Sequence, residues 1–171
     1  LPHTIVRADQ LDGALTIGYQ HTGYFSRKYT SDSEHWGSAG QFELNRTCNH
    51  RVIRFSDVLL MAAELESSNA QNYLDRVRDR VGLPSVPATL ENILKERRLV
   101  LSLEGIRYFD VLRRGLTYAN QELTHSVRGP NYVGDQQIFE VTFNTATKGF
   151  LPIPQTEIDL SAGAFRQNDG Y

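Results

Sequence analysis

The sequence predicts a mainly α protein of antiparallel helix hairpins, with a long irregular segment before them and an extended, proline-containing tail after them. Three observations lead to this prediction. Apolar residues recur at helical spacing through the middle of the chain, from residue 51 to residue 115. Short connections separate these periodic segments, and short connections between successive helices favour antiparallel hairpins. Two prolines within residues 151–154 are incompatible with a helix interior there.

The composition is that of an ordinary globular protein. The chain has 171 residues, 40% of them hydrophobic and 22% charged, and its formal net charge is −2. Its length predicts a single unit, divided into an irregular aromatic segment (1–50), helical hairpins (51–115), and loops with an extended tail (116–171). The charge argues against a nucleic-acid-binding surface, and no apolar run is long enough to span a bilayer. Because no signal peptide opens the chain, we expect a processed chain or a fragment.

Residues 1–50 lack helical periodicity but are rich in aromatic and small polar residues. Aromatic residues in such number argue against disorder. Flat rings beside hydrogen-bonding groups suit a carbohydrate, whose C–H faces stack on a ring while polar side chains contact the hydroxyls. The candidate carbohydrate-binding residues are Trp36, His35, Tyr24 and Tyr29. The alternative is that Trp36 packs onto the helices as a core residue, as aromatic residues more often do.

Two helices are predicted over 51–67 and 70–81. In the first, the buried face is expected to comprise Phe55, Val58, Leu59, Ala62 and Ala63. Gly82 follows the second helix and is placed for a left-handed C-terminal cap. Thr89 is predicted to cap a third helix, which continues through residues 95–115.

Charged residues interrupt the apolar pattern of residues 95–115. Arg97 and Glu104 fall on the apolar stripe, and Arg107 and Asp110 follow at helical spacing. Nearby arginines would hold Glu96 and Glu104 ionised, which is unlike a general acid. We therefore interpret Arg97, Glu104, Arg107 and Asp110 as structural ion pairs that join the helices, with catalysis as the alternative.

Regularity fades after Gly115. Residues 129–131 predict a turn, and an apolar run containing Ile138, Val141 and Phe143 predicts a short strand. The tail is expected to be extended and to pack its apolar residues along the helices. These residues are Leu151, Ile153, Ile158, Leu160 and Phe165.

No pattern in the sequence predicts a metal site, a cofactor or a catalytic centre. The five histidines are scattered, and no glycine-rich phosphate-binding loop is present. Cys48 and His50 are close in sequence, but sequence neighbours seldom have the geometry of a catalytic pair. We therefore expect no cofactor and no metal.

Four motifs resemble the SusD/RagB family of glycan-binding outer-membrane lipoproteins. They are the aromatic lysine-containing segment 23–29, the helix 51–64, the Glu-Arg-Arg to Glu-Gly-x-Arg stretch 96–115, and the C-terminal ending formed by 151–157 and 167–171. They follow one another in the family's order and are spread over most of residues 24–171. The sequence departs from the family pattern at Val100-Leu101, at Ser161-Ala162-Gly163 and at Asp169.

The resemblance implies a scaffold of tetratricopeptide-like hairpins, as in the C-terminal region of SusD-like proteins. It also implies binding of oligosaccharides at the outer-membrane surface and their delivery to a TonB-dependent SusC-like transporter, without catalysis. Family members are longer and carry a lipidated N-terminal cysteine, so the anchor and part of the glycan site are expected outside this sequence. The alternatives are a helical-hairpin adaptor that binds protein and no sugar, and a hydrolase using Glu96 or Glu104.

Overall fold

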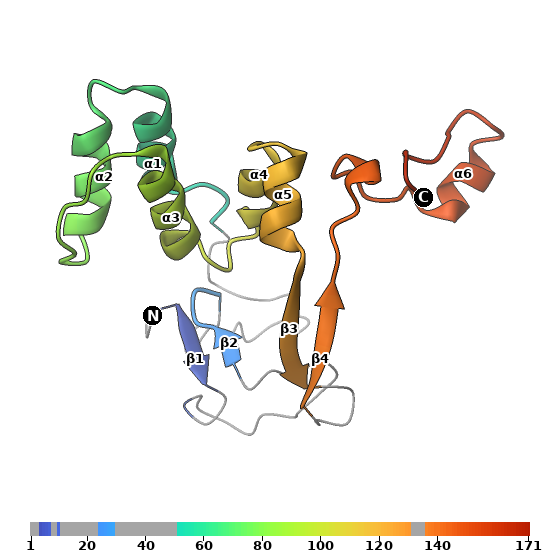
Figure 1. Cartoon of the computed structure of the whole chain (residues 1–171), viewed down its shortest axis with the longest axis horizontal. Coiled ribbons are helices and arrows are strands. Elements are labelled where there is room, and N and C mark those ends of the chain that lie inside the picture. The colour runs from blue at the N-terminus through green and yellow to red at the C-terminus, as the bar shows by residue number, and fades with distance from the viewer. Residues whose placement is uncertain (1–3, 8–9, 11–23, 30–50, 131–135) are drawn as a thin grey trace, which may run out of the picture. The chain divides into compact units, whose positions relative to one another are not determined.

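The structure of the chain is a computed structural model, and it describes residues 4–7, 10, 24–29, 51–130 and 136–171. The backbone divides into two compact units, residues 1–107 and 108–171, each described by itself below. Figure 1 shows the helices and strands along the chain. The described part is mainly helical, as the sequence predicted.

The first unit contains a small antiparallel pair of strands, β1 (Ile5–Arg7) and β2 (Tyr24–Ser26). Val6 lies opposite Phe25 in this pair, and Val6 is buried. The prediction that residues 1–50 are wholly irregular is therefore wrong at these positions. Strands of three residues are too short to show a period-two alternation, so no pattern in the sequence predicted them.

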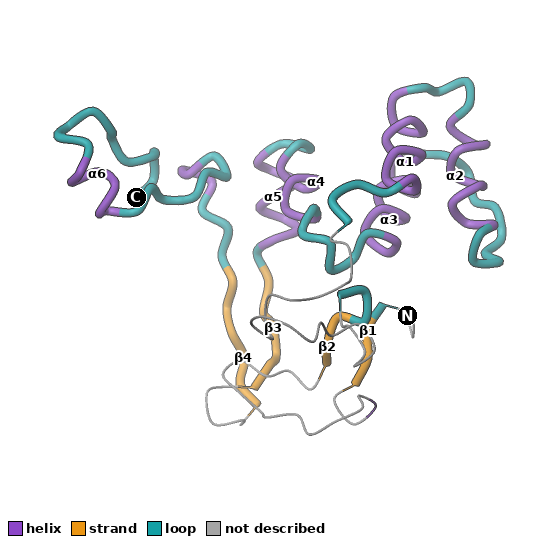
Figure 2. The backbone as a smooth tube through the Cα atoms, turned by 180° about the vertical axis from the view of Figure 1, so that it is seen from behind, coloured by secondary structure: helices purple, strands orange, loops and turns teal. Residues whose placement is uncertain are grey.

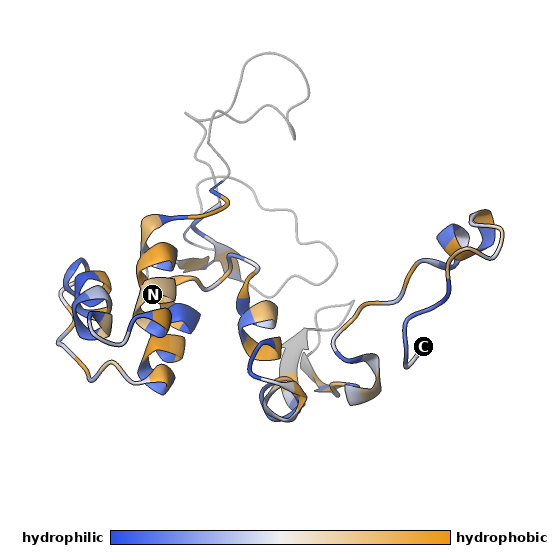
Figure 3. Ribbon diagram, turned by 90° about the horizontal axis from the view of Figure 1, so that it is seen from above, coloured by the Kyte–Doolittle hydropathy of each residue, from blue (hydrophilic) through white to orange (hydrophobic). Residues whose placement is uncertain are grey.

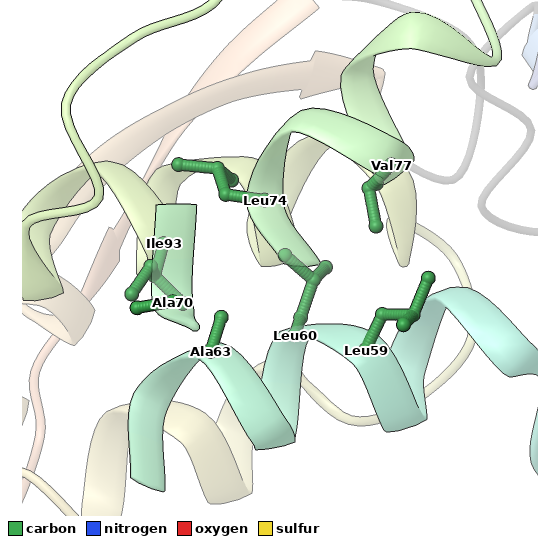
Figure 4. Packing of buried hydrophobic residues seen from close by; sticks show 7 residues of the cluster. All are labelled: Leu59, Leu60, Ala63, Ala70, Leu74, Val77 and Ile93. Carbon is green, nitrogen blue, oxygen red and sulfur yellow. The ribbon is translucent and has the colours of Figure 1, made fainter. Parts of the chain in front are cut away.

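Three helices form the rest of the first unit: α1 (Phe55–Leu65), α2 (Ala70–Asp79) and α3 (Leu90–Val100). Helix α1 lies between α2 and α3 and contacts both (Figures 1 and 2). The interhelical core is aliphatic, and Figure 4 shows how its side chains converge. Its buried members are Leu59, Leu60, Ala63, Ala70, Leu74, Val77 and Ile93.

Helix α1 begins four residues later than predicted, and its buried face is rotated. Arg54 is its N-cap residue and has an extended backbone. The buried residues of α1 are Leu59, Leu60 and Ala63, whereas Phe55 and Val58 are exposed. The prediction was wrong because α1 is apolar around most of its circumference, so the sequence alone did not show which side meets α2 and α3.

The connection from α2 to α3 has the conformation that the sequence predicted at both of its ends. Gly82 has a φ of 68°, the left-handed conformation typical of a helix C-terminus. The Thr89 hydroxyl accepts a hydrogen bond from the backbone N–H of Asn92 at 3.2 Å. Within the connection, the Gln71 side-chain amide donates to Val86 O and accepts from Ala88 N, at 2.9 Å each. These two hydrogen bonds hold the connection against α2.

Residues 95–115 do not form one helix, contrary to the prediction. Helix α3 ends at Val100, and α4 (Arg107–Leu112) begins after a turn. Within that turn, Leu103 and Gly105 have φ values of 65° and 77°. The left-handed conformation cannot continue an α-helix, so the apolar periodicity across this turn is not that of a single helix face.

The second unit combines short helices with a β-hairpin. Its helices after α4 are α5 (Leu116–Leu123), the 3₁₀ turn η3 (Thr145–Thr147) and α6 (Gln155–Leu160). The hairpin pairs β3 (His125–Pro130) with β4 (Gln136–Val141) in antiparallel register, Val127 lying opposite Phe139. The strand predicted around Ile138 and Val141 is confirmed.

Two predictions for residues 116–131 are wrong. Helix α5 was missed because it is only eight residues long, so its apolar stripe of Leu116, Ala119 and Leu123 gives a short signal. Gly129 and Pro130, which were predicted to form a turn, instead end strand β3. Proline is tolerated at the end of an edge strand, where its missing N–H breaks no interior ladder bond.

The tail is extended over residues 151–154, as its prolines predicted, but then forms α6. Pro154 is the N-cap residue, where the lack of an N–H does no harm. The expectation that the tail buries its apolar side chains is wrong for Leu151, Leu160 and Phe165, which are exposed. Apolar composition alone could not show which residues find a partner surface.

Coloured by hydropathy, the helices carry hydrophobic and hydrophilic residues on the same helix (Figure 3). Helix α1, which packs against both α2 and α3, is more apolar than either of them. Within the described residues, no helix is both long enough and apolar enough to cross a membrane.

Candidate functional site

Glu104 is the centre of a charged cluster that joins three separate segments of the first unit. Its Oε1 atom lies 2.6 Å from Lys28 Nζ and 2.9 Å from Arg54 Nη2. Arg54 Nε also donates to both carboxylate oxygens at 3.0 Å. The strand β2 region, the start of α1 and the turn after α3 therefore meet at one carboxylate, which is only 14% exposed.

The same two cations bind the carbonyl groups at the end of α3. Lys28 Nζ donates to Val100 O at 2.7 Å and to Ser102 O at 2.8 Å, in addition to Glu104. Arg54 Nη2 also donates to Val100 O. The last carbonyls of a helix lack intrahelical partners, and positive charge is favourable there. Lys28 and Arg54 thus stabilise the point at which α3 ends.

The environment of Glu104 favours its ionised form. Burial by itself would raise the pKa of Glu104, but the hydrogen bonds and charges of Arg54 and Lys28 outweigh burial and lower the pKa. A general acid needs the opposite shift, towards neutral pH. The geometry therefore suits Glu104 to a structural role.

This lowered pKa predicts a pH-dependent stability. When the folded pKa lies below the unfolded one, the stabilisation is complete above the ordinary value of 4.5 and is lost as pH falls through the folded pKa. We expect wild type to be more stable than Glu104→Gln at pH 7, with the difference shrinking below about pH 4.5. Chemical denaturation from pH 3 to 8 measures this difference. The matched control is Asp79→Asn, an exposed carboxylate at the end of α2. A difference that stays constant down to pH 3 would contradict the prediction.

Two further buried ion pairs hold the helices of the first unit together. Arg97 Nη1 lies 2.7 Å from Asp57 Oδ1 and links α3 to α1. Arg78 Nη1 lies 2.5 Å from Glu96 Oε2 and links α2 to α3. Arg97 and Glu96 are both buried and have lost most of their hydration. In each pair the opposite charge compensates for that loss.

The remaining charged residues predicted as ion pairs lie at the junction of the units and beyond it. Arg107 is the first residue of α4, at the boundary between the units. Asp110 is buried in α4 and lies 3.2 Å from Arg113 Nη2, one helical turn away. Asp57 is thus a partner of Arg97, Lys28 and Arg54 are partners of Glu104, and Arg113 is a partner of Asp110.

The structure describes two of the four candidate carbohydrate-binding residues. Tyr24 lies in β2 opposite Arg7, and Tyr29 follows the same strand; both side chains are exposed. Lys28 stands between them in sequence and is anchored to Val100, Ser102 and Glu104. Trp36 and His35 lie outside the described residues.

The C-terminal motif shapes the tail of the second unit. The Gln167 amide accepts from Ile153 N at 2.8 Å and donates to Ile153 O at 2.9 Å, like a neighbouring strand. Asn168 Nδ2 donates to Leu151 O at 2.6 Å. These amides satisfy the backbone of an extended segment whose prolines exclude helical bonding.

A pocket of about 530 Å³ adjoins the Glu104 cluster within the first unit. Lys28, Arg54 and Arg80 contribute to its wall, together with apolar residues that follow α2 and end α3. Among the described residues, no three His, Cys, Asp or Glu side chains gather as a metal site would require. The wall of the pocket thus combines three cations and apolar side chains with Thr4 and one carboxylate, Glu96.

Sequence reasoning missed Lys28, Arg54 and Asp57 as partners of the predicted ion pairs. Each lies inside a motif that carries the family resemblance, and this position in a motif was the one signal that could have pointed to them. Their partners are 40 to 76 residues away in the sequence, a separation that helical spacing cannot relate.

Comparison with known proteins identifies the family. The model of the SusD family matches residues 7–171. Surface glycan-binding protein A from Bacteroides thetaiotaomicron is 33% identical, with a TM-score of 0.74 over 99% of this chain and 37% of that one. A laminarin-binding SusD-like protein is 35% identical, with a TM-score of 0.74 over 98% of this chain and 34% of that one. The chain thus spans about a third of the length of these structures. A search of curated proteins gave no match. The chain belongs to the SusD family.

Proposed function

We propose that this chain takes part in non-enzymatic binding of oligosaccharides at the outer-membrane surface, for delivery to a TonB-dependent SusC-like transporter. The observation that supports this most strongly is membership of the SusD family, together with two solved relatives whose names state glycan or laminarin binding. A lipid anchor carried outside this sequence would hold the protein at the membrane.

The aromatic segment is the proposed contact with sugar. Tyr24 and Tyr29 are exposed on the described part of that segment, and Trp36 and His35 extend it in the sequence. The Lys28 bonds to the end of α3 support this assignment because they attach the segment to the helices. A ring held on a rigid support loses little freedom when a sugar stacks on it.

The proposal predicts that Tyr24→Ala and Trp36→Ala each weaken glycan binding about tenfold without lowering the melting temperature, because stacking area is lost and packing is not. Binding is measured by calorimetry with laminarin and by a glycan array. The control is Phe109→Ala, an exposed aromatic residue in the second unit. If Trp36→Ala lowers the melting temperature as well as the affinity for glycan, Trp36 belongs to the core instead.

The glycan array, a pull-down and a long incubation with glycan together separate the proposed function from its two alternatives. An adaptor would capture purified transporter in a pull-down but give no signal on the glycan array. A hydrolase would shorten the bound sugar on long incubation, whereas the proposed function leaves the glycan unchanged.

A further inference from the structure

A second pocket of the first unit is lined by arginine and apolar side chains. It has a volume of about 350 Å³ and lies between the start of α1 and the end of α2. Its walls are Arg54, Phe55, Ser56, Leu59, Arg76, Val77 and Arg80. Three of these seven residues carry a guanidinium, and none is a carboxylate. Arg54 and Arg80 also line the larger pocket beside Glu104, so the two hollows share a wall.

Among the described residues, guanidinium groups line this wall and no carboxylate does, although carboxylates lie elsewhere on α1 and α2. Glu104 is shared by two cations, Lys28 and Arg54, so that cluster keeps one positive charge in excess. Glu96, which lines the larger pocket, is paired with Arg78. Of the acidic residues on α1 and α2, Asp57 pairs with Arg97. Asp75 accepts hydrogen bonds from Gln71 and Ser85 and keeps its charge, and neither it nor Glu64 nor Asp79 lines the pocket.

Arg76 and Arg80 add two further charges. The Arg76 guanidinium lies 5.3 Å from the centre of the Phe55 ring, a cation–π distance. Arg80 is exposed at the end of α2 and, within the part of the chain that the structure describes, makes no ion pair. Its planar fork of donors is available to a carboxylate from solution, which it can bind with two parallel hydrogen bonds.

We propose that this pocket binds an acidic sugar unit, with Arg80 and Arg76 contacting the carboxylate of a uronic acid and Phe55, Leu59 and Val77 contacting its C–H face. The volume is in the range of small-molecule sites, and the pattern of apolar walls with a few convergent polar groups is typical of such sites. The inference rests on the proposed glycan-binding function and specifies a charged class of glycan.

The test compares a galacturonate and a glucuronate oligosaccharide with their carboxyl-reduced, neutral counterparts, using calorimetry on the full 171-residue chain. We expect at least one uronide to bind, its reduced counterpart to bind about 10-fold to 100-fold more weakly, and affinity to fall with added salt. Arg80→Ala and Arg76→Ala should each weaken uronide binding about tenfold or more. Arg80→Lys should restore part of the loss, because it keeps the charge but not the fork.

Arg166→Ala is the matched control. Arg166 is exposed and lies in the second unit, and its replacement removes one positive charge, as Arg80→Ala does. Circular dichroism and melting curves check that every variant is folded. Equal binding of the uronide and its reduced form, or an equal effect of Arg166→Ala and Arg80→Ala, would overturn the proposal. If neutral glycans bind and uronides do not, this inference fails and the proposed function stands. If no glycan binds at all, the proposed function fails as well.

Discussion

Replacing Arg97 with alanine is expected to destabilise the protein by about 3–5 kcal/mol, the cost of leaving one charge of a buried pair without its partner. Arg97 is 5% exposed and binds Asp57, which lies in the first turn of α1. Without the guanidinium, the largely buried Asp57 carboxylate loses this counter-charge between α1 and α3. Chemical denaturation at pH 7 measures the loss as a lower denaturation midpoint.

The matched control breaks an exposed pair of similar length. Lys148 Nζ lies 2.6 Å from Asp169, but their side chains are 61% and 72% exposed. Lys148→Ala is therefore expected to leave the denaturation midpoint close to that of wild type, because solvent screens an exposed pair. An equal cost for the two variants would mean that burial does not decide the strength of the Arg97 pair. Loss of glycan binding by Arg97→Ala with stability intact would assign Arg97 to a ligand site.

Leu74→Ala is expected to cost about 2–5 kcal/mol, because the deleted atoms leave a cavity that the surrounding helices fill only in part. Leu74 is 0% exposed, lies on α2 and belongs to the buried cluster drawn in Figure 4. The measurement is again the denaturation midpoint, together with the slope of the transition, which reports whether the folded unit stays compact.

Leu65→Ala is the control for this second prediction. It makes the same chemical change at the end of α1, where the side chain is 87% exposed. Its expected effect is within about 0.5 kcal/mol of wild type. If Leu74→Ala behaved like Leu65→Ala, the seven-residue cluster between α1, α2 and α3 would not be the stabilising core of the unit.

The sequence was most informative where the signal is local. Thr89 and Gly82 marked a helix start and a helix end because caps depend on the hydroxyl or the missing Cβ of one residue. The prolines at 152 and 154 excluded a helix interior for an equally local reason. Family membership was also readable from the sequence, since the motifs are short, ordered runs of residues.

Sequence reasoning failed where two distant segments decide the outcome. The apolar pattern of residues 95–115 predicted one helix, but the chain turns at Leu103 and Gly105, and Lys28 and Arg54 bind the carbonyls at the end of α3. These donors come from 72 and 46 residues away. No periodicity within one segment can report such a contact.

The candidate site shows the same division. The residue types were readable in advance: an aromatic segment with Tyr24 and Tyr29, and charges at Arg97 and Glu104 that interrupt an apolar pattern. Which cation meets which carboxylate was decided only by the tertiary structure, as was the placing of Arg54, Arg76 and Arg80 around one pocket. The physical reason is that caps and helical periods are properties of neighbouring residues, whereas ion pairing and pocket formation depend on distances in space.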